Sequence, residues 1–229
     1  MCLQVPSWLV AWSAQVQVLL PELDRLWGVP QRAEYHPEID TGVHVMLVLD
    51  MAAQLGAPLP VRFAAMTHDL GKGTTPQDML PRHIGHEERS ARLLKTVAQR
   101  MRVPTECAEL ADVVAREHGN IHRSLDLSAS ATVRLLERCD ALRKPQRFAD
   151  VLWACECDAR GRTGFADSAY PQRPRLQQAL AICLAVATEK IAAHAISMGA
   201  KGPKIGQAVH NARVQAVAEQ LPQAPAAHD

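Results

Sequence analysis

The chain has 229 residues, of which 48% are hydrophobic and 21% are charged, which is enough for one domain with an extension around a proper core. Its net charge of +1 gives no general attraction to nucleic acid or to an anionic membrane, so any RNA contact must come from local basic clusters. No Cys-x-x-Cys pair occurs among the six cysteines. We therefore expect reduced, mostly buried thiols in a cytoplasmic protein rather than a thiolate zinc site or a redox pair.

The first 20 residues are apolar and contain Trp8 and Trp12. The first basic residue is Arg25, so a signal peptide's positive n-region is missing, and polar residues interrupt a run that is too short to span a bilayer. We expect this segment to pack on its own domain, to self-associate or to meet a partner chain. Two tryptophans within five residues favour the last two, so deletion of residues 1–17 should convert a homo-oligomer into a monomer.

The rest of the chain has a helical period throughout, which predicts an all-α fold without strands. Asp40 or Thr41 and Ser128 are expected N-caps, and Gly56, Gly71 and Gly119 are expected helix ends. The expected helices cover 23–27, 41–55, 60–70, 83–101, 104–119, 128–140, 145–161, and the tail from 174 to 221 with a break at 199–203. The predicted organisation is an apolar segment over 1–20, a main helical domain over 21–165 and a helical tail over 166–229.

Histidine and aspartate residues recur in an order that is typical of helical metal phosphohydrolases. His68 and Asp69 are adjacent, His44 precedes them by 24 residues, and Asp140 follows 71 residues after Asp69. Two neutral imidazoles and two carboxylates make a complete set for one divalent ion. Asp69 can also bridge two ions, which gives it the central role in catalysis.

Further histidines allow a second ion. His86 and His118 lie between the His-Asp pair and Asp140 on expected helices, and two ions about 3.5–4 Å apart would hold a phosphoryl oxygen. His83 and His122 compete for these outer positions. The remaining histidines are expected at the surface: His36, His194, His210 and His228.

Basic residues flank this predicted site. Lys72 follows Asp69 beyond the expected helix end, where a mobile ammonium would neutralise a substrate phosphate. A basic run containing Arg143 and Lys144 follows Asp140, and Arg160 and Arg162 come one helix later. Each of these is either an ordinary solvated charge or a contact to phosphate or RNA.

Several segments resemble the C-terminal HD domain and tail of bacterial multifunctional CCA-adding enzymes, a family of tRNA nucleotidyltransferases. The similarity runs from about residue 18 to 220 and rests on the segments 18–24, 36–44, 62–73, 81–87, 143–147, 158–165 and 201–206. The resemblance implies metal roles for His44, His68, Asp69 and Asp140, and a divalent ion such as Mg²⁺, Mn²⁺ or Ni²⁺.

The function implied by this resemblance is hydrolysis of 2′,3′-cyclic or 2′-phosphorylated nucleotides or RNA ends, of the phosphodiesterase, 2′-nucleotidase or phosphatase type. Its partners would be a nucleotide or a tRNA 3′ end. The chain lacks a Gly-Ser pair followed by Asp-x-Asp, so CCA addition would need a separate polymerase-domain chain. Two alternatives stay open at this point: a nucleotide triphosphohydrolase of the same fold, and a non-catalytic tRNA-binding or interaction module.

Overall fold

The computed structural model describes residue 15 and residues 17–221, and these residues form α-helices joined by short 3-10 turns. The described part of the chain contains no β-strand, and its one extended pairing is an isolated antiparallel bridge between Pro30 and Asp40. The prediction of an all-α fold is confirmed. Of the apolar segment predicted over 1–20, residues 1–14 and 16 lie outside the described residues, as does His228.

The chain divides into two compact units that are not continuous in sequence. The first contains the residues up to His118 together with Trp153–Ala169, and the second contains Gly119–Leu152 together with the residues from Tyr170 onward. The linear boundaries predicted from the sequence, 21–165 and 166–229, stay a prediction.

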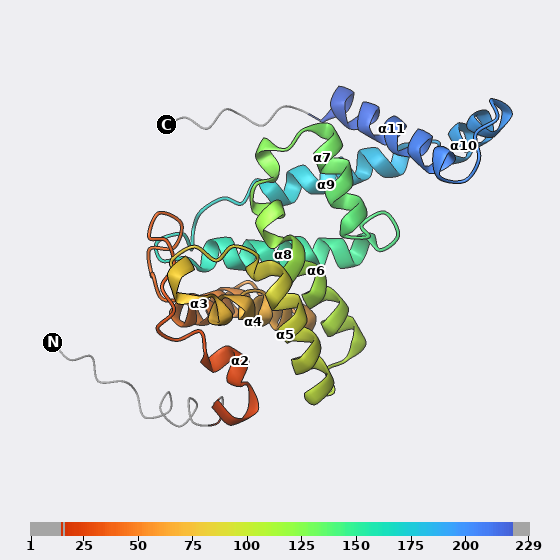
Figure 1. Cartoon of the computed structure of the whole chain (residues 1–229). Helices are drawn as coiled ribbons and strands as arrows, with labels where there is room; N and C mark the ends of the chain where they lie inside the picture. Colours follow the sequence, from red (N-terminus) through yellow and green to blue (C-terminus); the bar gives the residue numbers. More distant parts are fainter. Residues whose placement is uncertain (1–14, 16, 222–229) are drawn as a thin grey trace. The chain divides into compact units, whose positions relative to one another are not determined.

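Within residues 21–221, seven helical elements begin in the first unit. In chain order they are α2 (Pro21–Asp24), α3 (Thr41–Gln54), α4 (Leu59–Thr67), η1 (Leu70–Thr74), η2 (Gln77–Met79), α5 (His86–Arg100) and α6 (Thr105–His122) (Figure 1). Six begin in the second unit: η3 (Ser124–Asp126), α7 (Ala129–Arg138), α8 (Pro145–Gly161), α9 (Gln172–Ala185), α10 (Thr188–Ser197) and α11 (Pro203–Gln220). Helix α8 ends in the first unit, where it contributes to the site described below.

The expected caps are present. The Asp40 side chain accepts a hydrogen bond of 3.0 Å from the Val43 amide, and the Ser128 side chain accepts one of 3.3 Å from the Ala131 amide. Two boundaries differ from expectation. Helix α4 ends at Thr67, which leaves His68 and Asp69 in a turn, and α6 continues through Gly119 to His122, because an interior glycine costs a helix only about 1 kcal/mol.

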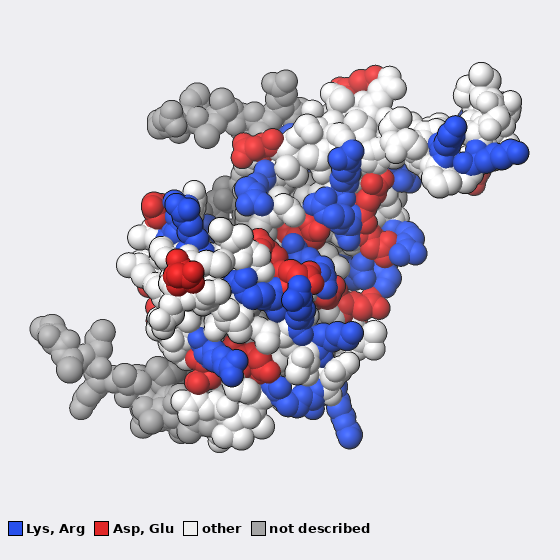
Figure 2. Space-filling model, viewed as in Figure 1, with Lys and Arg blue, Asp and Glu red and all other residues white. Residues whose placement is uncertain are grey.

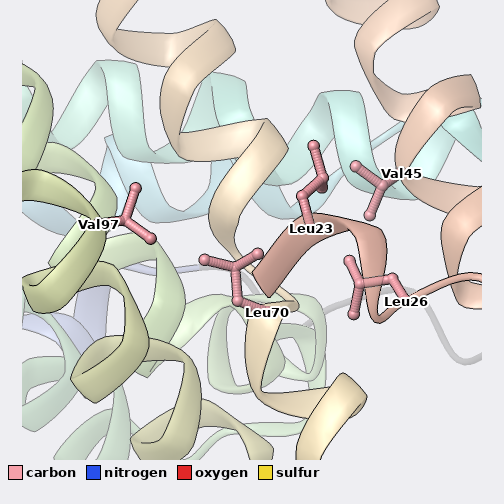
Figure 3. Close-up of a cluster of buried hydrophobic side chains, with 5 residues drawn as sticks. All are labelled: Leu23, Leu26, Val45, Leu70 and Val97. Atoms are coloured by element: carbon pink, nitrogen blue, oxygen red, sulfur yellow. The ribbon is translucent and has the colours of Figure 1, made fainter. Parts of the chain in front are cut away.

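Five side chains from four elements form a buried apolar cluster in the first unit. Figure 3 shows Leu23 and Leu26 at α2 facing Val45 of α3, Leu70 of η1 and Val97 of α5; all five are at most 4% exposed. Because Leu70 directly follows the His68-Asp69 pair, burial of its side chain ties the turn that carries this pair to the core.

The second unit is built by packing of α11 on α7 and α9. The break between α9 and α10 at Val186 and Ala187 was not predicted, because no glycine or proline marks it. Among the described residues no single helix is long and apolar enough to cross a membrane. Only when α9 and α10 are taken together, with the 49° bend between them, do their length and composition reach what a membrane span requires. On the face drawn in Figure 2, cationic and anionic residues are interspersed.

The cysteines that the structure describes are reduced and buried. They are Cys107, Cys139, Cys155, Cys157 and Cys183, all buried and without a disulfide.

Gly71 permits the closest approach between η1 and α5. A Cβ atom on Gly71 would lie 2.2 Å from the carbonyl oxygen of His86 and 2.5 Å from the amide nitrogen of Ser90. The Gly71 amide donates to the Ser90 hydroxyl at 2.9 Å, and the Arg89 guanidinium donates to the Gly71 carbonyl at 3.1 Å. The turn after Asp69 is therefore fixed against the first residues of α5.

We expect Gly71→Ala to destabilise the protein by about 1–3 kcal/mol, the usual cost of overpacking. The two atoms that the alanine Cβ would overlap, the His86 carbonyl oxygen and the Ser90 amide nitrogen, belong to the backbone and cannot move aside as a flexible side chain can. Chemical denaturation followed by circular dichroism measures this change. The matched control is Gly206→Ala in α11, where a Cβ atom meets nothing within 4 Å and alanine should be neutral or stabilising. Equal stability of the two variants would contradict the tight packing at η1.

Candidate metal centre

His68 and Asp69 lie in the turn between α4 and η1, and each is 1% exposed. The His68 Nδ1 atom lies 2.8 Å from the Ala65 carbonyl oxygen. Since a carbonyl oxygen only accepts, Nδ1 carries the proton and Nε2 is available as a ligand atom. His68 Nε2 lies 3.2 Å from one oxygen of Asp69, so the two members of the pair face the same point.

Two further imidazoles are held in the same way. His86 Nδ1 lies 2.8 Å from the His83 carbonyl oxygen, and His118 Nδ1 lies 3.0 Å from the Val114 carbonyl oxygen. Their Nε2 atoms are 3.3 Å apart and lie 3.3 and 3.6 Å from Asp69 Oδ1. Backbone carbonyls thus orient three imidazoles toward one carboxylate, a common arrangement around metal ions.

His44 and Asp158 extend this cluster. His44, on α3, is fully buried, and its Nε2 atom lies 3.1 Å from Asp158 Oδ1. The other Asp158 oxygen lies 3.6 Å from His68 Nε2. Asp158 reaches this position because α8 ends against α3: a Cβ atom on Gly161 would lie 2.7 Å from the Cα atom of Val48.

Glu38 supports His44 from the loop before α3. Its carboxylate lies 2.7 Å from His44 Nδ1 and 3.2 Å from His36 Nδ1, and its side chain is 2% exposed. The Thr163 amide donates to its second oxygen at 3.2 Å. Burial raises the pKa of Glu38, but hydrogen bonds from His36 and His44 outweigh burial and hold that pKa well below its usual value.

The chemistry of the donor set fits a divalent metal. His68 Nε2 and Asp69 Oδ1 are buried atoms without a hydrogen-bond partner, a costly arrangement unless an ion satisfies them. Metal–ligand bonds of about 2.0–2.2 Å place the ligand atoms of one ion within about 4.4 Å of one another. Three groups have atoms that lie within 4.8 Å of one another: His36, Glu38 and His44; His44, His68 and Asp158; and His68, Asp69 and His118.

The charges in the cluster follow from the same geometry. Burial lowers the pKa of His68, but the carboxylates of Asp69 and Asp158 outweigh it and raise that pKa to about 9. Burial raises the pKa of Asp69, but His68 and Lys72 hold it well below its usual value. The cluster therefore keeps ionised carboxylates at neutral pH, and a divalent cation would take the place of the proton on His68.

Lys72 is part of the cluster rather than a mobile surface charge. It lies on η1, is 6% exposed, and its Nζ atom is 2.7 Å from Asp69 Oδ2. It also donates a 2.5 Å hydrogen bond to Gln31 Oε1. The sequence predicted a mobile ammonium beyond a helix end, but Lys72 is held in place because the chain continues from Asp69 directly into η1.

Two predicted ligands, His86 and Asp140, are not members of these three groups, although His86 Nε2 lies 3.3 Å from Asp69 Oδ1. Asp140 has other partners. It lies in the second unit with a φ of 54°, and its carboxylate is 2.5 Å from Arg143 Nε and 3.5 Å from Arg147. Asp158 stands with His44 and His68 instead, although the sequence marked it only as part of a charged run. The available signal was helical spacing, since Asp158 continues the buried face of Val151 and Ala154 by one turn.

Three other histidines of the described residues are held by polar contacts. His36, expected at the surface, is mostly buried against Glu38. His83 is held between the Thr75 hydroxyl at 2.8 Å and the Pro30 carbonyl oxygen at 3.0 Å. His122, in the second unit, lies 2.9 Å from the Tyr170 hydroxyl. His83 and His122 were the alternatives to His86 and His118 as ligands, and neither belongs to the three possible metal groups of the described residues.

The predicted substrate-binding cations differ in their surroundings. Arg162 lies 3.9 Å from Asp158 Oδ1, beside the cluster. Arg160 donates to the Ala166 carbonyl and to Glu156 at 3.0 Å. Arg143, 82% exposed, pairs with Asp140, and Lys144 is also exposed. Arg160 and Arg162 belong to the first unit, and Arg143 and Lys144 belong to the second.

If Glu38 orients His44 for metal binding, Glu38→Gln should weaken the metal affinity about 10–100-fold, the usual effect of removing a carboxylate behind a ligating imidazole. Competition with a fluorescent chelator measures this affinity. The control is Glu88→Gln, because the Glu88 side chain on α5 is 51% exposed and pairs only with arginines. A Glu38→Gln protein with the control's affinity would show that His44 needs no such support.

Comparison with known proteins agrees with this geometry. Residues 41–154 match the family model described as HD domain. The chain is 71% identical over 211 residues to the "Multifunctional CCA protein" of Polaromonas naphthalenivorans (strain CJ2), covering 92% of this chain and 50% of the relative. It is 71% identical over 204 residues to the protein of that name from Acidovorax sp. (strain JS42), covering 89% of this chain and 48% of that relative. The chain spans about half the length of the curated relatives it matches. No solved structure matches it.

Proposed function

We propose that this chain, which carries an HD domain and corresponds to about half of a multifunctional CCA protein, is a divalent-metal-dependent phosphohydrolase. Its proposed substrates are 2′,3′-cyclic or 2′-phosphorylated nucleotides, free or at RNA ends. The observation that carries the proposal is the convergence of imidazole nitrogens on Asp69, with His68 Nε2 and Asp69 Oδ1 buried and unpartnered.

The ligands that we propose combine carboxylates and imidazoles. They are His44, His68, Asp69, His86, His118 and Asp158. Mg²⁺ prefers an all-oxygen shell, whereas imidazole donors suit first-row transition metals, so this set favours an ion such as Ni²⁺ or Mn²⁺ over Mg²⁺. When bound, one or two such ions polarise the phosphoryl oxygens and make a water nucleophilic.

The cations of the first unit have a supporting role in this proposal. Lys72, fixed between Asp69 and Gln31, brings a positive charge to the edge of the cluster, where a phosphoryl oxygen acquires charge in the transition state. Arg162 is positioned beside Asp158 and would bind a second phosphate oxygen. Arg160, Arg143 and Lys144 are proposed to contact the RNA backbone and to affect KM more than kcat.

The test begins with protein stripped of metal by a chelator and reloaded separately with Mg²⁺, Mn²⁺ or Ni²⁺. Metal content is measured after desalting, and turnover is measured with bis(p-nitrophenyl) phosphate, adenosine 2′,3′-cyclic monophosphate and a nucleoside triphosphate. We expect stoichiometric metal and hydrolysis of the first two compounds. Hydrolysis of the triphosphate alone would indicate a triphosphohydrolase, and metal-independent RNA binding without turnover would indicate an interaction module.

The relatives' name also motivates a proposal about partners. We propose that the physiological partners are a tRNA 3′ end and a polymerase-type domain of the kind that the other half of such a protein would supply. Gel filtration of this chain with and without tRNA, at two salt concentrations, tests the first of these contacts.

A further inference from the structure

A pocket of about 460 Å³ opens beside the candidate metal centre. Its walls come from the loop before α3, from Lys72 of η1, and from residues 81–87 before and at the start of α5. Lys72 and His86 belong both to this pocket and to the cluster around Asp69. A ligand in the pocket would therefore reach the metal centre with one end, and the size lies within the usual range for small-molecule sites.

At its inner end the pocket is bordered by Gln31, a buried side chain with one unused hydrogen-bond donor. Gln31 is 3% exposed, and its Oε1 atom accepts from Lys72 Nζ at 2.5 Å. Because the ammonium group can only donate, this contact fixes the oxygen side of the amide and leaves Nε2 as a donor. Gln31 Nε2 is buried without a partner. A ligand with an acceptor group would relieve the free-energy cost of that unpaired donor.

At its outer end the pocket has an aromatic platform. The Arg32 guanidinium lies 5.1 Å from the centre of the Tyr35 ring, and Tyr35 is 57% exposed. An exposed ring backed by a guanidinium is a surface on which a nucleobase stacks, since every base has a π face.

The charge of the walls indicates an anionic ligand. The cations that line the pocket are Arg32, Lys72 and Arg82, and the lining carboxylate is Glu87. Two of these cations also pair with carboxylates outside the lining, Arg32 with Glu34 and Lys72 with Asp69. The inner end holds Lys72 and His86, and the outer end holds Tyr35. A nucleotide fits this arrangement, with its phosphate at the cationic inner end and its base at the aromatic outer end.

We propose that this pocket binds the terminal nucleotide of the substrate, with its phosphate toward Lys72 and His86 and its base stacked on Tyr35. Gln31 Nε2 donates a hydrogen bond to an oxygen of the ligand, and Gln31 at the same time holds Lys72 beside Asp69. This inference rests on the proposed phosphohydrolase function and names the residues that distinguish a nucleotide from other phosphate esters.

The main experiment compares kcat/KM for adenosine 2′-monophosphate with kcat/KM for glycerol 2-phosphate, which has a phosphate but no base, in the metal-loaded full chain. Tyr35→Ala should lower the ratio of the two constants at least about fivefold, and Tyr35→Phe, which keeps the ring, should restore it. Gln31→Met should lower kcat/KM for both compounds, because it removes the donor and releases Lys72. Arg92→Ala, an exposed arginine on α5 outside the pocket, is the control for loss of a charge.

Failure of this inference and failure of the proposed function give different results. If the protein hydrolyses adenosine 2′-monophosphate but Tyr35→Ala leaves the ratio unchanged, the function stands and the pocket assignment is overturned. If no variant turns over either compound, calorimetry with adenosine 2′-monophosphate still measures binding directly. Binding that weakens in Tyr35→Ala and recovers in Tyr35→Phe supports the pocket, and binding equal in all proteins, or no binding, overturns it.

The source of the nucleotide is tested with a short RNA that carries a 2′-phosphate at its 3′ end. If Tyr35→Ala lowers kcat/KM by a similar factor for this RNA and for the mononucleotide, the pocket binds the terminal nucleotide whether it is free or part of an RNA. A loss for the mononucleotide alone also supports the pocket and identifies free nucleotides as its ligands. A loss for the RNA alone would place Tyr35 at an inner nucleotide and contradict the proposed orientation.

Discussion

Asp69→Asn is expected to abolish metal binding and hydrolysis together. Among the described residues, Asp69 is the one carboxylate that lies within 3.6 Å of all three of His68, His86 and His118, so its replacement removes the negative charge on which those imidazoles converge. Loss of a supporting residue costs about 10–100-fold in affinity. Loss of this central ligand should exceed that range, and a chelator competition assay with Mn²⁺ or Ni²⁺ measures it.

The same substitution removes the partner of Lys72, which is 6% exposed. Leaving one member of a buried pair unpaired costs about 3–5 kcal/mol, so folding must be measured beside metal binding. The control is the double variant Asp69→Asn with Lys72→Met, which removes both charges and should recover much of the stability without recovering metal binding. Stoichiometric metal in a folded Asp69→Asn protein would refute the site.

The sequence predicted those parts of the site that depend on local order. Ser128 was predicted as a cap, and Asp40 or Thr41 as another, because a short polar side chain directly before an apolar helical period is a typical N-cap; the structure selects Asp40. His86 and His118 were grouped with the His68-Asp69 pair by their order along the chain, and the structure brings their Nε2 atoms to within 3.6 Å of Asp69.

Other parts depend on contacts between distant segments and could not be predicted. Glu38 and His36 lie in a loop without periodicity, and they are buried because the bridge between Pro30 and Asp40 closes that loop beside α3. Lys72 was expected as a mobile ammonium beyond a helix end, either near a substrate phosphate or solvated, since a pattern in sequence does not reveal that η1 packs against α5 at Gly71.

Asp140 and Asp158 show the limit of helical spacing as a guide. Each follows a buried apolar residue of its own helix by about one turn: Leu136 precedes Asp140, and Ala154 precedes Asp158. The difference lies in the backbone. Helix α7 ends at Arg138 and Asp140 takes a left-handed conformation, which aspartate adopts more readily than most residues, whereas α8 continues to Gly161 and carries Asp158 on its buried face.

This difference predicts opposite outcomes for two conservative substitutions. Asp158→Asn should lose most metal affinity and activity, because it neutralises the carboxylate that lies 3.1 Å from His44 and 3.6 Å from His68. Asp140→Asn should keep both, because its partners are Arg143 and Arg147 rather than members of the metal groups. Loss of its pair with Arg143, whose side chain is 82% exposed, should cost less than about 1 kcal/mol of stability, as exposed ion pairs do.

Metal content after desalting and hydrolysis of bis(p-nitrophenyl) phosphate are measured for the two proteins side by side, with thermal unfolding to show that both are folded. Each variant serves as the control for the other, since both exchange one aspartate for asparagine. If Asp140→Asn loses the metal and Asp158→Asn retains it, the ion is held by the second unit rather than by the groups around His44 and His68. Only the reverse result is compatible with a centre built from α3, α5, α6, the turn at His68 and Asp69, and the end of α8.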